Sequence, residues 1–263
     1  MSHAIKIAPT RRQIVKGAAA APLAAVLADP SLTAHAAAGL QTVSTKTKDG
    51  RTVSAALARP ATDAAPVPSV MLIHEWWGLN DQIKAVASDF ARQGYMALAI
   101  DLYDGAVAET REKAGSLARS VKDAEGRATT AAWIDWLRAD ASTTERVGTV
   151  GWCFGGGWSL TASQDTPVDA TVIYYGNVRR EADALGSLKG PVLGHFATQD
   201  RFINEDMVSG FKAAMAEAGK PLTVHWYKAD HAFANPTSAR YDEADAALSW
   251  ERTTAFFEDH LKG

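Results

Sequence analysis

A single cysteine stands between glycines where the sequence changes from strand-like to helix-like composition. Val147–Trp152 mixes β-branched residues with glycine, as a short buried strand does, and Trp158–Ala162 suits a helix. Between them, Gly151-x-Cys153-x-Gly155 matches the strand–turn–helix motif that presents a nucleophile, with cysteine in place of serine. Helix N-terminal amides behind such a turn stabilise a thiolate. The spacing predicts a nucleophile, and a glycine-rich turn around an inert buried cysteine is the alternative.

A cysteine nucleophile needs a base that takes its proton and a group that orients this base. Asp200 follows the buried run Val192–Ala197, and His231 follows the last predicted strand, Leu222–Tyr227. The order nucleophile, acid, histidine is that of enzymes with this strand–turn–helix motif. The sequence therefore predicts a triad of Cys153, Asp200 and His231.

Two other residues compete for the roles of acid and base. His74 also lies at a strand end, and Asp230 stands directly before His231. Neighbouring side chains on a loop rarely face each other, so Asp200 is the preferred acid. The remaining histidines lie near the N-terminus, inside predicted strands or at the end of the last helix: His3, His35, His195, His225 and His260. His231 is therefore the preferred base.

The loop after the first long buried strand begins with His74 and Glu75 and contains two tryptophans. In folds with this motif, such a loop donates one amide to an oxyanion hole, and the residue after the nucleophile donates the other. These amides belong to Trp76 and Phe154. Glu75, partly desolvated beside the tryptophans, favours its protonated form and is expected to exchange a proton with Cys153. A salt bridge at the pocket rim is the alternative role for Glu75.

The elements that position these residues alternate between strands and helices. An Asp-Gly turn between Gln41–Thr47 and Arg51–Ala58 predicts an antiparallel hairpin. Buried strands are expected at Ser69–His74, Tyr95–Ile100, Val147–Trp152, Ala170–Tyr174, Val192–Ala197 and Leu222–Tyr227. Helices are expected at Asp81–Arg92, Glu109–Lys122, Glu125–Arg138, Trp158–Ala162, Glu205–Ala218 and Tyr241–Leu261. This pattern predicts an α/β fold with a mostly parallel sheet, helices on both faces and the hairpin on one edge.

Composition limits the kinds of partner. The chain has 263 residues, 47% hydrophobic and 22% charged, with a formal net charge of -3, which suits one globular domain. We expect no nucleic acid, because no basic stripe is interleaved with aromatics. The single cysteine makes no intramolecular disulfide. His74-Glu75 lacks the second histidine of a zinc motif, and we expect no metal ion, no cofactor and a monomer.

The first residues differ in composition from the rest. Paired Arg11-Arg12 precede the weakly apolar run Gly17–Ala28, and Ala34-His35-Ala36 is a small-residue cleavage pattern. The layout resembles a twin-arginine signal over residues 1–36, cleaved after Ala36, with a single domain at 40–263. We expect a periplasmic mature protein and no membrane contact beyond export. An alanine-rich N-terminus that is helical or disordered is the alternative.

Taken together, these residues resemble the dienelactone hydrolase family, cysteine-dependent members of the α/β-hydrolase fold, from about Val53 to Phe257. The matching motifs are His74-Glu75-Trp76-Trp77-Gly78-Leu79-Asn80, Asp101-Leu102-Tyr103, Gly151-Trp152-Cys153-Phe154-Gly155-Gly156, Tyr174-Tyr175-Gly176, Asp200 and His225-Trp226-Tyr227 with His231-Ala232-Phe233. The resemblance implies a catalytic set of Cys153, Asp200 and His231, with Glu75 activating the thiol. It implies hydrolysis of an enol-lactone to maleylacetate through an acyl-cysteine, without a cofactor.

Substrate-binding positions follow the family less closely. One of its two carboxylate-binding arginines maps onto Arg111, whereas the other position is Asn235. Ala232 replaces a serine, and Gly115 and Ala118 replace aromatic residues. One arginine and a neutral amide hold a carboxylate less firmly than two arginines, which predicts a wider, less anion-selective pocket. The alternative is that Arg111 is one member of an exposed pair of side chains on a helix. The expected substrate-binding residues are Arg111, Trp152, Tyr174 and Asn235.

The sequence therefore predicts an exported hydrolase that cleaves lactones or small activated esters through Cys153. A broad-specificity carboxylesterase or thioesterase keeps the chemistry and changes the substrate. A non-catalytic periplasmic binding protein on a hydrolase scaffold is the third possibility, and it is disfavoured because all four polar catalytic positions are filled.

Overall fold

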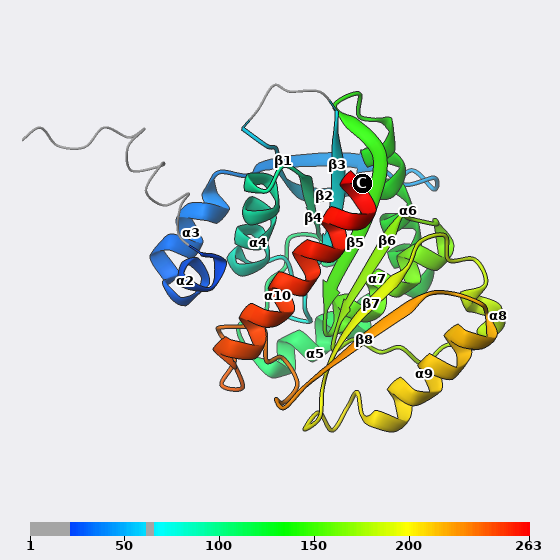
Figure 1. Cartoon of the computed structure of the whole chain (residues 1–263). Coiled ribbons are helices and arrows are strands. Elements are labelled where there is room, and N and C mark those ends of the chain that lie inside the picture. The colour runs from blue at the N-terminus through cyan, green and yellow to red at the C-terminus, as the bar shows by residue number, and fades with distance from the viewer. Residues whose placement is uncertain (1–21, 62–65) are drawn as a thin grey trace, which may run out of the picture.

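The computed structural model describes residues 22–61 and 66–263. One eight-stranded sheet, in the order β1-β2-β4-β3-β5-β6-β7-β8, runs through the molecule with helices on both faces (Figure 1). The strands are β1 (Gln41–Lys46), β2 (Thr52–Ala58), β3 (Val67–Ile73), β4 (Met96–Ile100), β5 (Thr143–Trp152), β6 (Ala170–Tyr174), β7 (Val192–Ala197) and β8 (Leu222–Tyr227). The predicted α/β architecture is confirmed.

The N-terminal hairpin forms one edge of this sheet. β1 pairs antiparallel with β2, which pairs antiparallel with β4, and all pairs from β4 to β8 are parallel. The turn closes through Gly50, whose N–H donates to Thr47 O at 2.9 Å and whose φ is +86°. A positive φ costs a glycine little, which explains the Asp-Gly turn. The parallel pairing brings the carboxyl ends of β3 to β8 to one edge.

Apolar side chains on the two faces of the sheet meet different helices. The alternation is clear in β4, where Ala97 and Ala99 join the cluster with α4, and Met96 and Leu98 join the cluster with α6. β4 is buried on both sides because both faces are covered. The main helices are α4 (Asp81–Arg92) and α10 (Glu243–Phe257) on one face, and α6 (Asp123–Ala139), α7 (Phe154–Asp165) and α9 (Glu205–Glu217) on the other.

Several element boundaries differ from the sequence prediction. α5 (Arg111–Ser120) begins at Arg111 because the Thr110 hydroxyl accepts the Lys113 N–H and caps the helix. α10 begins after the capping residue Asp242 and continues as a π-helical turn, η1 (Glu258–Lys262). The short helix α8 (Ala182–Leu185) was not predicted, since four residues are too few for a periodic pattern.

Before the hairpin lie two helices, α2 (Leu23–Ala28) and α3 (Pro30–Ala38). They pack beside α4, with Leu23 and Val26 buried, and the expected cleavage position after Ala36 falls within α3. Arg11-Arg12 and the rest of residues 1–21, like residues 62–65, lie outside the described residues. The predicted signal therefore stays a prediction.

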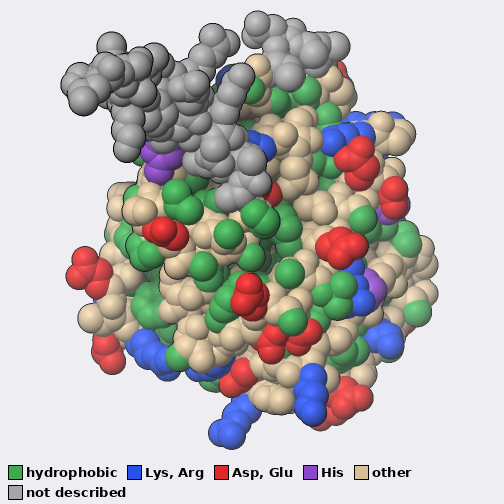
Figure 2. Space-filling view, turned by 60° about the vertical axis from the view of Figure 1, so that its left-hand side comes forward, with side chains coloured by type: hydrophobic (Ala, Val, Ile, Leu, Met, Phe, Trp, Pro, Cys, Tyr) green, Lys and Arg blue, Asp and Glu red, His purple; other side chains and the backbone are tan. Residues whose placement is uncertain are grey.

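The face of the molecule shown in Figure 2 carries mixed charge. Figure 2 shows acidic and basic side chains interspersed with apolar ones, without a stripe of one sign on the face in view. Within the described ranges, none of the helices is long and apolar enough to cross a membrane.

Candidate active site

Cys153 sits on a sharp turn between β5 and α7. Its φ of 54° lies in the left-handed region, where a non-glycine residue is strained, and the N–H groups of Gly156 and Gly157 donate to its carbonyl. A Cβ on Gly151 would lie 2.0 Å from Gly155 O, so the turn closes only with glycine there. A Cβ on Gly155 would lie 2.2 Å from Ile73 O, so this glycine makes room for the end of β3.

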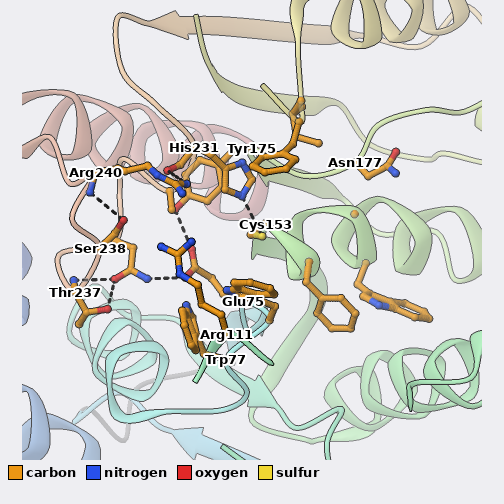
Figure 3. A pocket seen from close by; sticks show the side chains of 18 of the residues that line it. Glu75, Trp77, Arg111, Cys153, Tyr175, Asn177, His231, Thr237, Ser238 and Arg240 are labelled. Atoms are coloured by element: carbon orange, nitrogen blue, oxygen red, sulfur yellow. Dashed lines mark hydrogen bonds between the residues drawn. The ribbon is translucent and has the colours of Figure 1, made fainter. Parts of the chain in front are cut away.

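The structure brings the three predicted triad residues together. Cys153 Sγ lies 3.1 Å from His231 Nε2 (Figure 3). On the other side of the ring, His231 Nδ1 lies 2.6 Å from Asp200 Oδ2. The three side chains follow β5, β7 and β8, whose carboxyl ends share one edge of the sheet. This line of thiol, imidazole and carboxylate can pass a proton from sulfur to nitrogen.

Hydrogen bonds and burial determine the protonation states of Asp200 and His231. Burial by itself lowers the pKa of His231, but its hydrogen bonds to Asp200 and Cys153 and their charges raise that pKa to about 10. Burial raises the pKa of Asp200, yet the bond to His231 and the amides of Ile203 and Phe202 lower it overall. The arrangement therefore favours an ionised Asp200 beside a protonated imidazole.

Each competing residue has a different structural partner. His74 is fully buried, its Nε2 accepts the Leu102 N–H at 3.2 Å, and Nδ1 contacts Glu75 O at 2.6 Å. Burial lowers the pKa of His74, so a neutral ring with the proton on Nδ1 satisfies both contacts. Asp230 Oδ1 accepts the backbone N–H of His231 at 2.7 Å instead of reaching its ring.

Glu75 is 3% exposed and bound by two donors. Tyr175 Oη donates to Oε1 at 3.2 Å, and Asn235 Nδ2 donates to Oε2 at 2.6 Å. Burial raises the pKa of Glu75, and these donors together with the charge of His231 offset the rise only in part. The Cys153 sulfur contacts His231 in this arrangement, and the Glu75 carboxyl is held by the other two residues.

The two predicted oxyanion amides face no competing acceptor. Phe154 is the first residue of α7, where backbone N–H groups have no intrahelical partner. Trp76 lies in a turn closed by the Gly78 N–H, which donates to Glu75 O at 3.2 Å. Neither the Trp76 amide nor the Phe154 amide donates to any other described residue. Both amides remain available to a developing negative charge.

A pocket of about 790 Å³ opens over Cys153. This volume lies within the range of pockets that bind drug-sized molecules and exceeds the needs of a small lactone ring. Arg111, exposed at the start of α5, and Asn235 both line it. The other lining residues include Trp77, Phe154, Trp158, Tyr175, Asn177, Arg180, Phe202, Thr237, Ser238 and Arg240.

The prediction that Trp152 and Tyr174 bind substrate requires correction. Neither lines the pocket, and Tyr174 is buried with its hydroxyl donating to Ser249 O at 2.9 Å. Its neighbour Tyr175 faces the site instead, because the backbone turns at the end of β6 with a φ of 37° at Tyr175. The Tyr-Tyr doublet was the only available signal for Tyr175.

Pocket residues on both sides of His231 in the sequence were also missed. Phe202 and the loop residues Thr237, Ser238 and Arg240 line the pocket, and no motif marked them. For metal binding, the described ranges contain no group of three His, Cys, Asp or Glu side chains arranged to hold an ion.

The sheet order, the strained turn and the aligned thiol, imidazole and carboxylate define a member of the α/β-hydrolase class. The model of the dienelactone hydrolase family matches residues 53–261. The chain belongs to the dienelactone hydrolase family of carboxymethylenebutenolidase-like hydrolases.

Individual relatives match most of this chain and most of their own length. The chain is 32% identical over 205 residues to Protein usf of Aquifex pyrophilus, covering 74% of this chain and 89% of that protein. It is 31% identical over 229 residues to a carboxymethylenebutenolidase of Pseudomonas putida, covering 81% and 94%. A solved Klebsiella pneumoniae structure, whose name places it among the dienelactone hydrolases, matches with a TM-score of 0.75 and 27% identity, covering 83% and 98%.

Proposed function

We propose that this hydrolase cleaves lactones and small esters through a covalent acyl-cysteine at Cys153. The observation that carries the proposal is the continuous contact from sulfur to imidazole to carboxylate, 3.1 Å and 2.6 Å long, at the base of the pocket. A thiolate is the reactive form of cysteine, and an imidazole that keeps its proton supports it. The pKa of His231, raised to about 10, favours that protonated imidazole.

The reaction proceeds in two halves. The thiolate of Cys153 attacks the carbonyl carbon, the carbonyl oxygen becomes an oxyanion, and collapse breaks the bond to the leaving oxygen. His231 gives its proton to that oxygen, so an ester releases its alcohol, whereas the enol of an opened lactone remains attached to Cys153 through the acyl group. A water molecule then loses a proton to His231 and attacks the thioester, and the carboxylic acid leaves as the thiolate re-forms.

Backbone amides and Glu75 support these steps. The amides of Trp76 and Phe154 donate to the oxyanion, a contribution of about 3 to 4 kcal/mol for one such donor. Burial raises the pKa of Glu75. Its proposed role is to take the proton from Cys153 whenever the sulfur is a neutral thiol, once substrate displaces the present hydrogen bonds of Glu75, and so to restore the thiolate that attacks. This role predicts slower acylation in Glu75→Gln, and unchanged thiol reactivity would reduce Glu75 to a structural residue.

The proposed substrates include the dienelactone that gives the family its name, with less selectivity for its carboxylate. Arg111 is the single cation at the two expected carboxylate-binding positions, and the amide of Asn235 is already bound to Glu75. A broad carboxylesterase or thioesterase activity is the second candidate, favoured by a pocket of about 790 Å³. A non-catalytic binding protein is disfavoured by the complete triad geometry.

The test is direct detection of the covalent intermediate. The protein is mixed with p-nitrophenyl acetate or a dienelactone, quenched within seconds and analysed by mass spectrometry, with Cys153→Ala as the control. We expect turnover and an acyl adduct on Cys153 that the alanine variant lacks. Turnover of p-nitrophenyl acetate without turnover of the dienelactone would support the acyl-cysteine mechanism and exclude the dienelactone as a substrate. No turnover and no adduct would refute the proposal and favour a binding protein.

We propose in addition that the chain is exported to the periplasm. The support is the order of paired arginines, the apolar run Gly17–Ala28 and the Ala34-His35-Ala36 pattern. Export of an already folded protein suits a chain with one cysteine. N-terminal sequencing of the mature protein is expected to begin at Ala37, and replacing Arg11 and Arg12 by lysine should retain the precursor in the cytoplasm. A mature protein that keeps residues before Ala36 would refute the cleavage site.

A further inference from the structure

Phe202 is an exposed aromatic residue that contacts two members of the triad, Asp200 and His231. Its side chain lines the pocket, and the residue is 67% exposed, more than Val107 at 47% or Leu248 at 40%. Its backbone N–H donates to Asp200 Oδ1 at 2.8 Å, so the carboxylate that orients the histidine also fixes this residue. The ring lies edge-on to the His231 ring, with centroids 5.7 Å apart and planes at 75°.

The reaction geometry determines which half of an ester reaches this ring. The carbonyl oxygen must lie at the amides of Trp76 and Phe154, and the leaving oxygen must lie within hydrogen-bonding reach of His231 Nε2. The acyl and alcohol halves therefore diverge, with the alcohol half on the His231 side. Tyr175, whose ring centroid lies 5.2 Å from that of His231, is fully buried and closes the inner side of the imidazole.

The substituent on the leaving oxygen consequently extends toward solvent along the exposed partner of His231, which is Phe202. An exposed phenyl ring gains most from a flat apolar ring, since aromatic pairs in offset or edge-to-face contact are favourable beyond the area they bury. Resting on the proposed esterase chemistry, we propose that Phe202 recognises the leaving group and selects esters of aromatic alcohols.

The test separates the two halves of the substrate. Phenyl acetate and 2-naphthyl acetate differ in the leaving group, whose acidity is similar, whereas p-nitrophenyl acetate and butyrate differ only in the acyl group. Values of kcat/KM are measured for wild type, Phe202→Ala and Leu248→Ala. Leu248 is the matched control, because it is exposed, apolar and outside the pocket lining. Thermal unfolding checks that each variant is folded. We expect both variants to fold, because each substitution shortens an exposed side chain.

We expect wild type and Leu248→Ala to prefer the naphthyl over the phenyl ester by about tenfold, the effect of covering one further apolar ring. Phe202→Ala should reduce that preference to less than about threefold and leave the butyrate-to-acetate ratio unchanged. Hydrolysis of the isolated acetyl-Cys153 enzyme should proceed at the wild-type rate in Phe202→Ala, because the alcohol has already departed.

An unchanged naphthyl preference in Phe202→Ala would overturn the inference while ester turnover still supported the proposed function. A shift of equal size in the acyl series, or slower hydrolysis of the acetyl-enzyme, would also overturn it, because Phe202 would then shape the whole site. Absence of turnover in wild type would refute the proposed function, and this inference with it.

Discussion

Replacing Asp200 by asparagine removes one charge beside His231 and preserves the shape of the side chain. The pKa of His231 rises from its ordinary 6.5 to about 10 in this site, which corresponds to about 5 kcal/mol in favour of the imidazolium. Asp200 and Cys153 both contribute to that rise, so loss of Asp200 should remove part of it and lower the pKa of His231. A hydrogen bond to a charged group contributes about 1.5 to 3 kcal/mol, so we expect kcat/KM to fall about 10- to 150-fold in Asp200→Asn.

The pH profile gives the sign of the effect. A lowered pKa of His231 means that the imidazolium loses its proton at a lower pH, so the alkaline limb of kcat/KM should move to lower pH. The assay follows p-nitrophenyl acetate hydrolysis between pH 5 and 10, together with the alkylation rate of Cys153 by iodoacetamide. The asparagine oxygen can still accept the N–H groups of Phe202 and Ile203, so the loop should remain in place.

Asp230→Asn is the matched control. It carries the same chemical change one residue from His231, but its carboxylate binds the His231 backbone N–H and faces Arg240. We expect less than about a threefold effect on kcat/KM and an unshifted pH profile. Equal losses in the two variants, or an unaffected Asp200→Asn, would refute the assignment of Asp200 as the orienting acid.

Two further predictions concern the support of the site. Gly151→Ala places a Cβ 2.0 Å from Gly155 O and should lower the free energy of unfolding, measured in guanidinium, by about 3 kcal/mol. The control Gly210→Ala, in an open position of α9, should raise the free energy of unfolding by about 0.5 to 1 kcal/mol. Unchanged stability of Gly151→Ala would mean that the turn can relax around the added methyl group. Tyr175→Phe leaves Glu75 Oε1 without its donor, should lower the unfolding free energy by about 1 to 3 kcal/mol and raise the Glu75 pKa further. Unchanged stability in the same denaturation assay would show that Glu75 finds another donor.

The backbone of the site was predictable because its signals are local. Continuous apolar runs mark buried strands, and glycine on both sides of Cys153 marks a turn that tolerates no Cβ at Gly151. The boundaries that failed were those set by single hydrogen bonds, such as the Thr110 cap that starts α5 at Arg111. Such bonds depend on side-chain geometry that periodicity does not contain.

The substrate pocket was less predictable because its walls come from distant segments. Tyr174 and Tyr175 are identical in type and adjacent, and only the turn after β6 determines that the second faces Glu75. Asn235 was expected to contact substrate, yet the fold places its amide on the Glu75 carboxylate 160 positions earlier in the chain. Phe202 belongs to no sequence motif, and its position follows from the hydrogen bond that its backbone N–H donates to Asp200 Oδ1.

The sequence by itself determined the strand–helix alternation, the motif around Cys153 and the order of Cys153, Asp200 and His231, because these depend on residue types at short spacing. Only the tertiary structure decided that the His231 ring meets the sulfur and that Asp200, rather than Asp230, meets that ring. It also placed the donors that hold Glu75 and Phe202 beside the imidazole. Those contacts join residues from separate strand ends, and their distances exist only once the parallel sheet has brought the carboxyl ends of those strands to one edge.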